Sequence, residues 1–266
     1  MFLGVEIGGT KLQVGVCDRQ GRVRQLERVV VTRSAGAAGI RRQLAAMIPP
    51  LLKHYRVKAI GVGFGGPVDA ESGRALISHQ IAGWDKFPLR KWFVRRFDLP
   101  TVIGNDQDCA VLAEARCGAG KGKRIVFYVT VGTGIGGGLT VDGKLYNGRY
   151  GAAEIGHTKL FHQGRWRTIE SLASGLAIEH GVSTVSQAAR HLGVAIANTI
   201  AIVNPDVMIV GGGVASAGEK FWRPLRQTVA RLVFPIYRKN YRLVLPKLGR
   251  NVVVVGAALL AADQGV

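Results

Sequence analysis

Three glycine-rich turns, each directly after an apolar run, constrain the fold of this chain more than any other feature. They are residues 8–11 (GGTK), 132–136 (GTGIG) and 211–213 (GGG). The first two stand between two expected β-strands, whereas the glycine loops of Rossmann and Walker A motifs open a helix. Glycine lets backbone N–H groups approach a phosphate chain closely, and threonine hydroxyls add donors. One such turn is typical of an ordinary hairpin, but three in this order predict a phosphate-binding site.

A unit of strand, glycine turn, strand and strand occurs twice, and each copy is followed by helices and further apolar strands. In the second copy the dipeptide Asp142-Gly143 is a strong hairpin signal. This weak duplication predicts two α/β lobes, residues 1–106 and 107–266, with a cleft between them and the last helix packing back on the first lobe. The expected strands are residues 3–7, 12–17, 23–31, 59–64, 101–103, 125–131, 137–141, 144–146, 207–210 and 252–255, and the expected helices include residues 169–180 and a last helix from Gly256.

The composition indicates a globular protein in a reducing compartment. Apolar residues make up 47% of the 266 residues, and no apolar run approaches the roughly 20 residues that span a bilayer. The N-terminus reaches a charge at Glu6, too early for a signal peptide. Cys17, Cys109 and Cys117 form an odd set without a C-x-x-C pair, so we expect buried or free thiols. We therefore predict a cytoplasmic protein with no membrane partner.

The formal net charge of +19 is unusual, and residues 19–58 and 220–262 carry much of it. The second segment contains no acidic residue at all. Such a surface suits a polyanion, namely nucleic acid, polyphosphate or an anionic membrane. The charges are spread over several expected elements, however, and this pattern favours solvated arginine-rich surfaces over a polyanion-binding site.

Asn105 and Asp106 follow the expected strand 101–103 and precede a helix. Ligand sites of α/β proteins form outside the carboxyl ends of strands. In phosphoryl transfer to a hydroxyl, an aspartate there accepts the hydroxyl proton. The alternative role is to cap the helix, which Asp108 is equally placed to do. Further polar candidates for ligand binding are Glu154, His157 and Glu170, although Glu170 also suits a helix N-terminus.

Seven segments of the chain resemble, in the same order, those of the ROK proteins, the repressor, open-reading-frame and sugar-kinase family. The resemblance covers nearly the whole chain. It implies a two-lobed actin-like (ribonuclease-H-like) fold that closes over a sugar and ATP, with Mg²⁺ accompanying the nucleotide, and it implies a homodimer. The family's repressors carry an N-terminal winged-helix extension, and this chain begins directly at the first strand, so we expect a kinase. The segments are FLGVEIGGTKLQ (2–13), GFGGPVD (63–69), GNDQDCAVLAEARCGAG (104–120), TVGTGIGGG (130–138), GAAEIGH (151–157), ESLASG (170–175) and NPDVMIVGGGV (204–214).

The resemblance also implies roles for individual residues, with Asp106 as the catalytic base. The implied substrate-binding residues are Gly66, Gln80, Asn105, Asp106, Glu154, His157 and Glu170. The implied nucleotide-binding residues are Gly8, Gly9, Thr10, Lys11, Gly132, Thr133, Gly134, Gly136, Gly211, Gly212 and Gly213.

Four departures accompany the resemblance. Glu6 replaces the family's aspartate, in position for an indirect contact to Mg²⁺, and Gln80 replaces its sugar-binding asparagine. Residues 158–169 contain no cysteine where the family has a zinc segment, so structural zinc is predicted to be absent because a tetrahedral site needs four ligands. The helical region between Gly175 and Val185 is short.

The leading hypothesis is an ATP-dependent kinase that phosphorylates a hydroxyl of a hexose or an N-acyl-hexosamine. One alternative is a catalytically weak sugar- or nucleotide-sensing protein, suggested by Glu6 and Gln80. A polyphosphate-dependent glucokinase is a second, because members of that subgroup also lack the zinc segment and a basic surface suits that donor. A polyanion-binding protein is the third.

Overall fold

The computed structural model of the chain describes residues 1–78, 80–148 and 151–264. The chain forms two compact units. The first combines Met1–Cys117 with Leu248–Val266, and the second is Gly118–Lys247. Every helix in the described residues is too short or too polar to cross a membrane.

A five-stranded mixed sheet with the strand order β3-β2-β1-β4-β7 forms the centre of the first unit. β1 pairs antiparallel with β2 and parallel with β4, and β4 pairs parallel with β7. β1 and β4 are buried at every residue, as expected for apolar strands inside a sheet that is covered on both faces. The carboxyl ends of β1, β4 and β7 therefore share one edge. The strands are β1 (Phe2–Ile7), β2 (Lys11–Cys17), β3 (Val23–Val30), β4 (Ala59–Phe64) and β7 (Thr101–Asn105).

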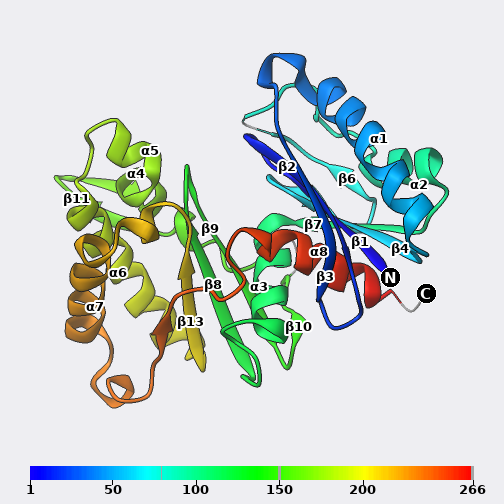
Figure 1. The fold of residues 1–266 in the computed structure, drawn as a ribbon. Helices are drawn as coiled ribbons and strands as arrows, with labels where there is room; N and C mark the ends of the chain where they lie inside the picture. Colours follow the sequence, from blue (N-terminus) through cyan, green and yellow to red (C-terminus); the bar gives the residue numbers. More distant parts are fainter. Residues whose placement is uncertain (79, 149–150, 265–266) are drawn as a thin grey trace. The chain divides into compact units, whose positions relative to one another are not determined.

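Helices cover both faces of this sheet (Figure 1). α1 (Gly36–His54) and α2 (Leu89–Phe97) contribute their apolar side chains to a core on one face. α8 (Val252–Ala262) lies on the other face, beside α3 (Asp106–Cys117). A small hairpin of β5 (Val68–Asp69) and β6 (Arg74–Ala75) lies in the connection between β4 and α2.

A row of three glycines brings α8 close to the sheet. Gly4 of β1 pairs with Gly15 of β2 on one side and with Gly61 of β4 on the other. A Cβ atom on Gly4 would lie 2.0 Å from the backbone oxygen of Val254, and one on Gly61 would lie 1.7 Å from that of Ala257. Any side chain larger than hydrogen would thus push the helix off the sheet.

This packing explains one wrong prediction. Residues 252–255 are four valines, which the sequence predicts as a strand because β-branched residues favour strands. In the structure they form the first turn of α8. Every residue of α8 except Leu260 is buried, so tertiary packing against the glycine row overrides the local preference.

The second unit repeats the plan of the first. Its sheet has the order β10-β9-β8-β13-β14, with β8 antiparallel to β9 and parallel to β13. α4, α6 and α7 pack on the core of this sheet. The predicted α/β fold class is confirmed. The elements are β8 (Ile125–Val131), β9 (Ile135–Val141), β10 (Lys144–Leu145), β13 (Val207–Gly211), β14 (Leu243–Val244), α4 (Ile169–Ala173), α5 (Gly175–Glu179), α6 (Val185–Val203) and α7 (Glu219–Leu232).

Two boundaries differ from the sequence-based expectation. The single helix expected over residues 169–180 is divided at Ser174, whose hydroxyl accepts a hydrogen bond from the Ala177 N–H at 3.2 Å and so starts α5. The sequence predicts the lobe boundary after residue 106, whereas the structure keeps α3 in the first unit. α3 packs tightly on α8, because a Cβ on Gly256 would lie 1.7 Å from the Cys109 backbone oxygen.

Candidate active site

In the first unit, the strand ends at one sheet edge lead into segments predicted to bind ligands. β1 runs into the first glycine turn, which is closed by a 3.1 Å hydrogen bond from the Gly8 N–H to the Lys11 oxygen. β4 runs into Gly65, whose N–H donates to the Ile7 oxygen at 2.9 Å. β7 runs into Asp106. The backbone thus ties the first turn to the loop after β4, as the strand order requires.

Asn105 connects two of these segments. Its side-chain nitrogen donates to the Gly66 oxygen at 3.0 Å, and its Oδ1 accepts from the Gln107 N–H at 2.8 Å. Asn105 therefore supplies a capping bond at the start of α3, a role for which the sequence offers Asp106 and Asp108.

Asp106 is half-buried where β7 meets α3. Burial raises the pKa of its carboxyl from 3.8 to about 7; the charge of Glu6 adds to this shift and hydrogen bonds with Gln107 oppose it. A Cβ on Gly65 would lie 3.5 Å from the Asp106 Oδ2, so the carboxyl group lies against the glycine after β4. A carboxylate with a pKa near 7 is able to accept a proton efficiently at neutral pH.

Glu6 lies at the same edge and is buried. Its Oε1 is 2.9 Å from the Lys11 Nζ, and its Oε2 accepts a hydrogen bond from the Gln13 Nε2. Gln13 also donates to the Arg250 oxygen at 3.0 Å. Sequence reasoning missed Gln13, although one polar residue in an otherwise apolar strand was a signal. As a carboxylate beside the first glycine turn, Glu6 has the oxygen chemistry that Mg²⁺ prefers.

Gln80 lies over the first glycine turn. A Cβ on Gly9 would be only 1.8 Å from the Gln80 Oε1, so the exposed Gln80 side chain occupies the space beside that glycine. Arg33 donates from its Nε to the Gly9 oxygen at 3.0 Å. The structure thus brings Gln80 to the turn that also contains Thr10.

In the second unit, two short helices hold the second glycine turn. Glu170 of α4 accepts a hydrogen bond from the Ile135 N–H at 2.8 Å through its Oε2, and a Cβ on Gly134 would lie 2.5 Å from that oxygen. Gly175, at the start of α5, donates to the Gly132 oxygen at 2.7 Å. Glu170, predicted to bind the sugar, is thus engaged with the second glycine turn in this structure.

The third glycine turn lies beside the end of β8, because β8 and β13 are parallel neighbours. Gly212 has φ +93°, and a Cβ there would lie 2.3 Å from the Val131 oxygen. Gly213 has open space around its Cβ position. The second and third turns therefore meet at one edge of the second sheet.

Glu154 and His157 both lie in the second unit, on the segment that follows β10. The Glu154 Oε2 is 4.0 Å from the His157 Nε2, and both side chains are exposed. This segment packs on β9, because a Cβ on Gly137 would lie 2.2 Å from the Ala153 oxygen. The predicted substrate-binding residues are thus divided between the units, with Gly66, Gln80, Asn105 and Asp106 in the first and Glu154, His157 and Glu170 in the second.

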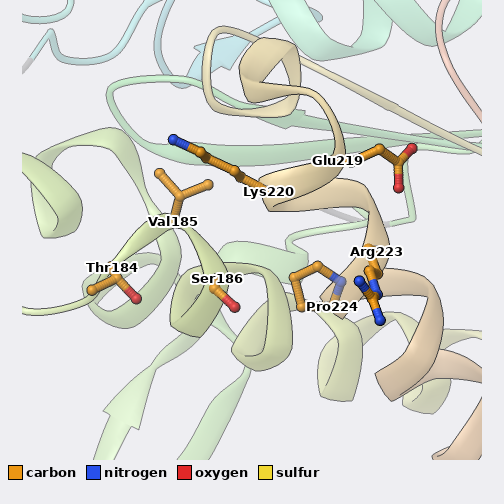
Figure 2. A pocket seen from close by; sticks show the side chains of 7 residues that line it. All are labelled: Thr184, Val185, Ser186, Glu219, Lys220, Arg223 and Pro224. Carbon is orange, nitrogen blue, oxygen red and sulfur yellow. The ribbon is translucent and has the colours of Figure 1, made fainter.

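An open pocket of about 610 Å³ lies between the first turns of α6 and α7 (Figure 2). α7 follows the third glycine turn through the short 3-10 helix Val214–Ala217. Sequence reasoning missed this pocket because it depends on how two distant helices pack. Its lining residues are Thr184, Val185, Ser186, Glu219, Lys220, Arg223 and Pro224.

A β-hairpin of β11 (Lys159–His162) and β12 (Arg165–Thr168) occupies the segment without cysteines. Its His162 ring packs on the His191 ring of α6 with centroids 4.8 Å apart, and burial lowers the pKa of His191. Within residues 1–78, 80–148 and 151–264, no group of three or more His, Cys, Asp or Glu side chains is arranged to hold a metal ion. The absence of structural zinc stays a prediction.

Comparison with known proteins gives consistent matches over the whole chain. The model of the ROK family matches residues 2–187 and 179–264. A glucokinase from Halalkalibacterium halodurans is 28% identical, with 99% of this chain and 95% of the relative covered. The ROK hexokinase from Thermus thermophilus has a TM-score of 0.88 at 29% identity, with 99% and 98% covered. The ROK glucokinase from Streptomyces griseus, solved with glucose and AMPPNP, has a TM-score of 0.83 at 30% identity, with 99% of each chain covered. These likenesses confirm the predicted actin-like fold.

Proposed function

The chain belongs to the ROK family, and on that basis we propose that it is an ATP-dependent sugar kinase acting on a hexose or an N-acyl-hexosamine. The enzyme is a phosphotransferase of the hexokinase type, with an alcohol group as acceptor. The observation that carries the proposal is Asp106, a half-buried carboxyl with a pKa near 7, at the sheet edge that also holds the first phosphate turn.

In the proposed reaction, Asp106 is the general base. A sugar hydroxyl oxygen attacks the γ-phosphorus of ATP, and its proton passes to the Asp106 carboxylate. The bond between the γ-phosphorus and the bridging oxygen breaks, and ADP leaves with the electron pair. Asn105 fixes the start of α3 through its bonds to Gly66 and Gln107, and so orients the base.

We assign the phosphates of ATP to the first two glycine turns, and the nucleoside to the third turn and the pocket between α6 and α7. Backbone N–H groups of the turns would hold phosphate oxygens, and Lys11 adds a positive charge. Glu6 fits an indirect contact to Mg²⁺, which when bound neutralises charge on the phosphates. Support comes from the Streptomyces griseus enzyme, a glucokinase that binds glucose and the ATP analogue AMPPNP.

The test is sugar-dependent ADP release by Asp106→Asn. We expect kcat to fall about 10²–10⁴-fold, the usual loss when a general base is removed. Asp98→Asn is the matched control: it removes the same charge at an exposed left-handed position (φ 54°) that asparagine tolerates. Equal turnover by Asp106→Asn and the wild type would contradict the assignment.

Two further measurements separate the alternatives: sugar phosphate formation with ATP or polyphosphate as donor, and thermal unfolding with and without ligand. A sensing protein would gain thermal stability with sugar or nucleotide but release no product. The observation that favours this alternative is the Lys11–Glu6 ion pair, because the pair engages the lysine of the first turn. A polyphosphate-dependent enzyme would turn over with polyphosphate and not with ATP. The homodimer, the cytoplasmic location and the absence of a nucleic-acid partner stay predictions.

A further inference from the structure

Gln13 is a polar side chain in an apolar strand. Residues 12–17 of β2 are all buried, and Gln13 is completely so. A buried amide that lacks partners destabilises the folded state. Here both ends of the amide have partners, and those partners come from three different segments of the first unit.

The partners of Gln13 lie directly beside it in the sheet. Glu6 of β1 is its register partner on one side, and Arg28 of β3 is its register partner on the other. Arg28 donates from its Nε to the Gln13 Oε1 and from its Nη2 to the Asn251 Oδ1. The row therefore runs across three strands and ends at the N-terminus of α8.

Chemistry fixes the orientation of the Gln13 amide. A guanidinium can only donate hydrogen bonds, so the Gln13 Oε1 must face Arg28. The Nε2 must then face Glu6 and the Arg250 oxygen, two groups that accept. A flipped amide would oppose donor to donor at Arg28 and acceptor to acceptor at Glu6.

Lys11 completes the arrangement. Its Nζ reaches the Glu6 Oε1 at 2.9 Å and the Arg250 oxygen at 3.4 Å. Lys11 and Gln13 thus bridge the same two acceptors. If Gln13 lost its amide, Glu6 would be held by Lys11 alone, and both side chains could take other rotamers.

We propose that Gln13 is a positioning residue for the first phosphate turn: oriented by Arg28, it holds Glu6 so that Lys11 is preset for the nucleotide phosphates. This inference rests on the proposed function, because it assigns the turn to ATP. Gln13 itself is completely buried, so it acts through Glu6 and Lys11.

The experiment measures binding of AMPPNP with Mg²⁺, and of glucose, by calorimetry. We expect Gln13→Leu to weaken AMPPNP about tenfold and to leave the affinity for glucose unchanged. In a Glu6→Gln background the same substitution has a much smaller effect, because the two residues act as a unit. Gln25→Leu is the control, since the Gln25 amide on β3 donates to the Glu27 side chain of the same strand at 2.9 Å. Arg28→Met, at an exposed position, tests the same row without altering the core.

Three results would overturn the inference. The first is wild-type affinity for AMPPNP in a folded Gln13→Leu variant. If Gln13→Leu does not fold, wild-type affinity in a folded Arg28→Met variant is the equivalent result. The second is that the effects of Gln13→Leu and Glu6→Gln on AMPPNP binding add in full. The third is that Gln13→Leu weakens glucose binding as much as it weakens AMPPNP binding. Failure of the kinase proposal looks different: the wild type binds AMPPNP, and Gln13 still matters, but no sugar is phosphorylated. A wild type that binds no nucleotide contradicts both proposals.

Discussion

The first and second glycine turns occupy equivalent places in two sheets of the same plan but are held by different forces. The first turn is surrounded by charge: Glu6 pairs with Lys11 at 2.9 Å, and Gln13 completes the network. The second is held mainly by backbone, with Gly175 bonded to the Gly132 oxygen at 2.7 Å and Glu170 accepting from a backbone N–H.

This difference teaches that a repeated topology does not dictate how a repeated site is stabilised. In the first unit, side chains of neighbouring strands hold the turn, so the charges of those side chains matter most for its stability. In the second unit helices approach the turn so closely that there is no room for a Cβ atom. The first turn should therefore respond to changes of charge and salt, and the second to changes of volume.

The largest effect is expected from adding volume at the second turn. A Cβ on Gly175 would lie 2.6 Å from the Gly132 oxygen, so Gly175→Ala must displace the turn. Overpacking of this kind costs about 1–3 kcal/mol, and we expect AMPPNP binding to weaken on the order of 10–100-fold in calorimetry. Gly164→Ala, on the hairpin turn, is the control: it strains the backbone locally because φ is +78°, but nothing lies near its Cβ position, so nucleotide affinity should stay intact. If Gly175→Ala bound AMPPNP as tightly as the wild type, the second turn would not depend on the close approach of the helix.

A smaller effect is expected from removing charge at the first turn. Lys11→Met should weaken AMPPNP about tenfold at low salt, and it should flatten the decline of affinity with ionic strength because exposed charges are screened. Lys53→Met, at the exposed end of α1, serves as the control. If AMPPNP affinity declined equally with ionic strength in Lys11→Met and the wild type, the charge of Lys11 would not contribute to nucleotide binding at the first turn.

The smallest expected effect concerns stability near the first turn. The pKa of Asp106 is raised in the folded state to about 7 from 3.8, so ionising it disfavours folding. The wild type should therefore lose stability relative to Asp106→Asn as pH rises from about 4 to 7, with no further change above that. We expect the stability gain of Asp106→Asn to be clearly larger at pH 8 than at pH 5, measured by urea unfolding. A pH-independent difference would argue against a raised pKa.

Much of the fold could be predicted from the sequence because its strands are short apolar runs that end in glycine. The turn at residues 8–11 and the strand before Asp106 are local patterns, and the structure has both elements where the sequence indicates them. The four valines at 252–255 predict a strand but form a helix. Their helical state depends on packing against Gly4, Gly15 and Gly61, which are far away in the sequence.

The candidate site could be predicted only as a set of residue types. Asn105 and Asp106 follow from their place at a strand end. The link between Gln13 and Arg28 does not, because it needs the register of three strands. Likewise, the bond between Glu170 and Ile135 depends on helix α4 returning to a turn that precedes it by more than thirty residues.

The glycine row beneath α8 has a consequence for synthesis on the ribosome. β1, β2 and β4 are made first, but the helix that covers their glycine face belongs to Leu248–Val266 and emerges only after the whole second unit. At translation rates of roughly 5–20 residues per second, that sheet face waits uncovered for several seconds or more. During this interval the nascent chain exposes apolar surface of the kind that makes partly folded chains prone to aggregation.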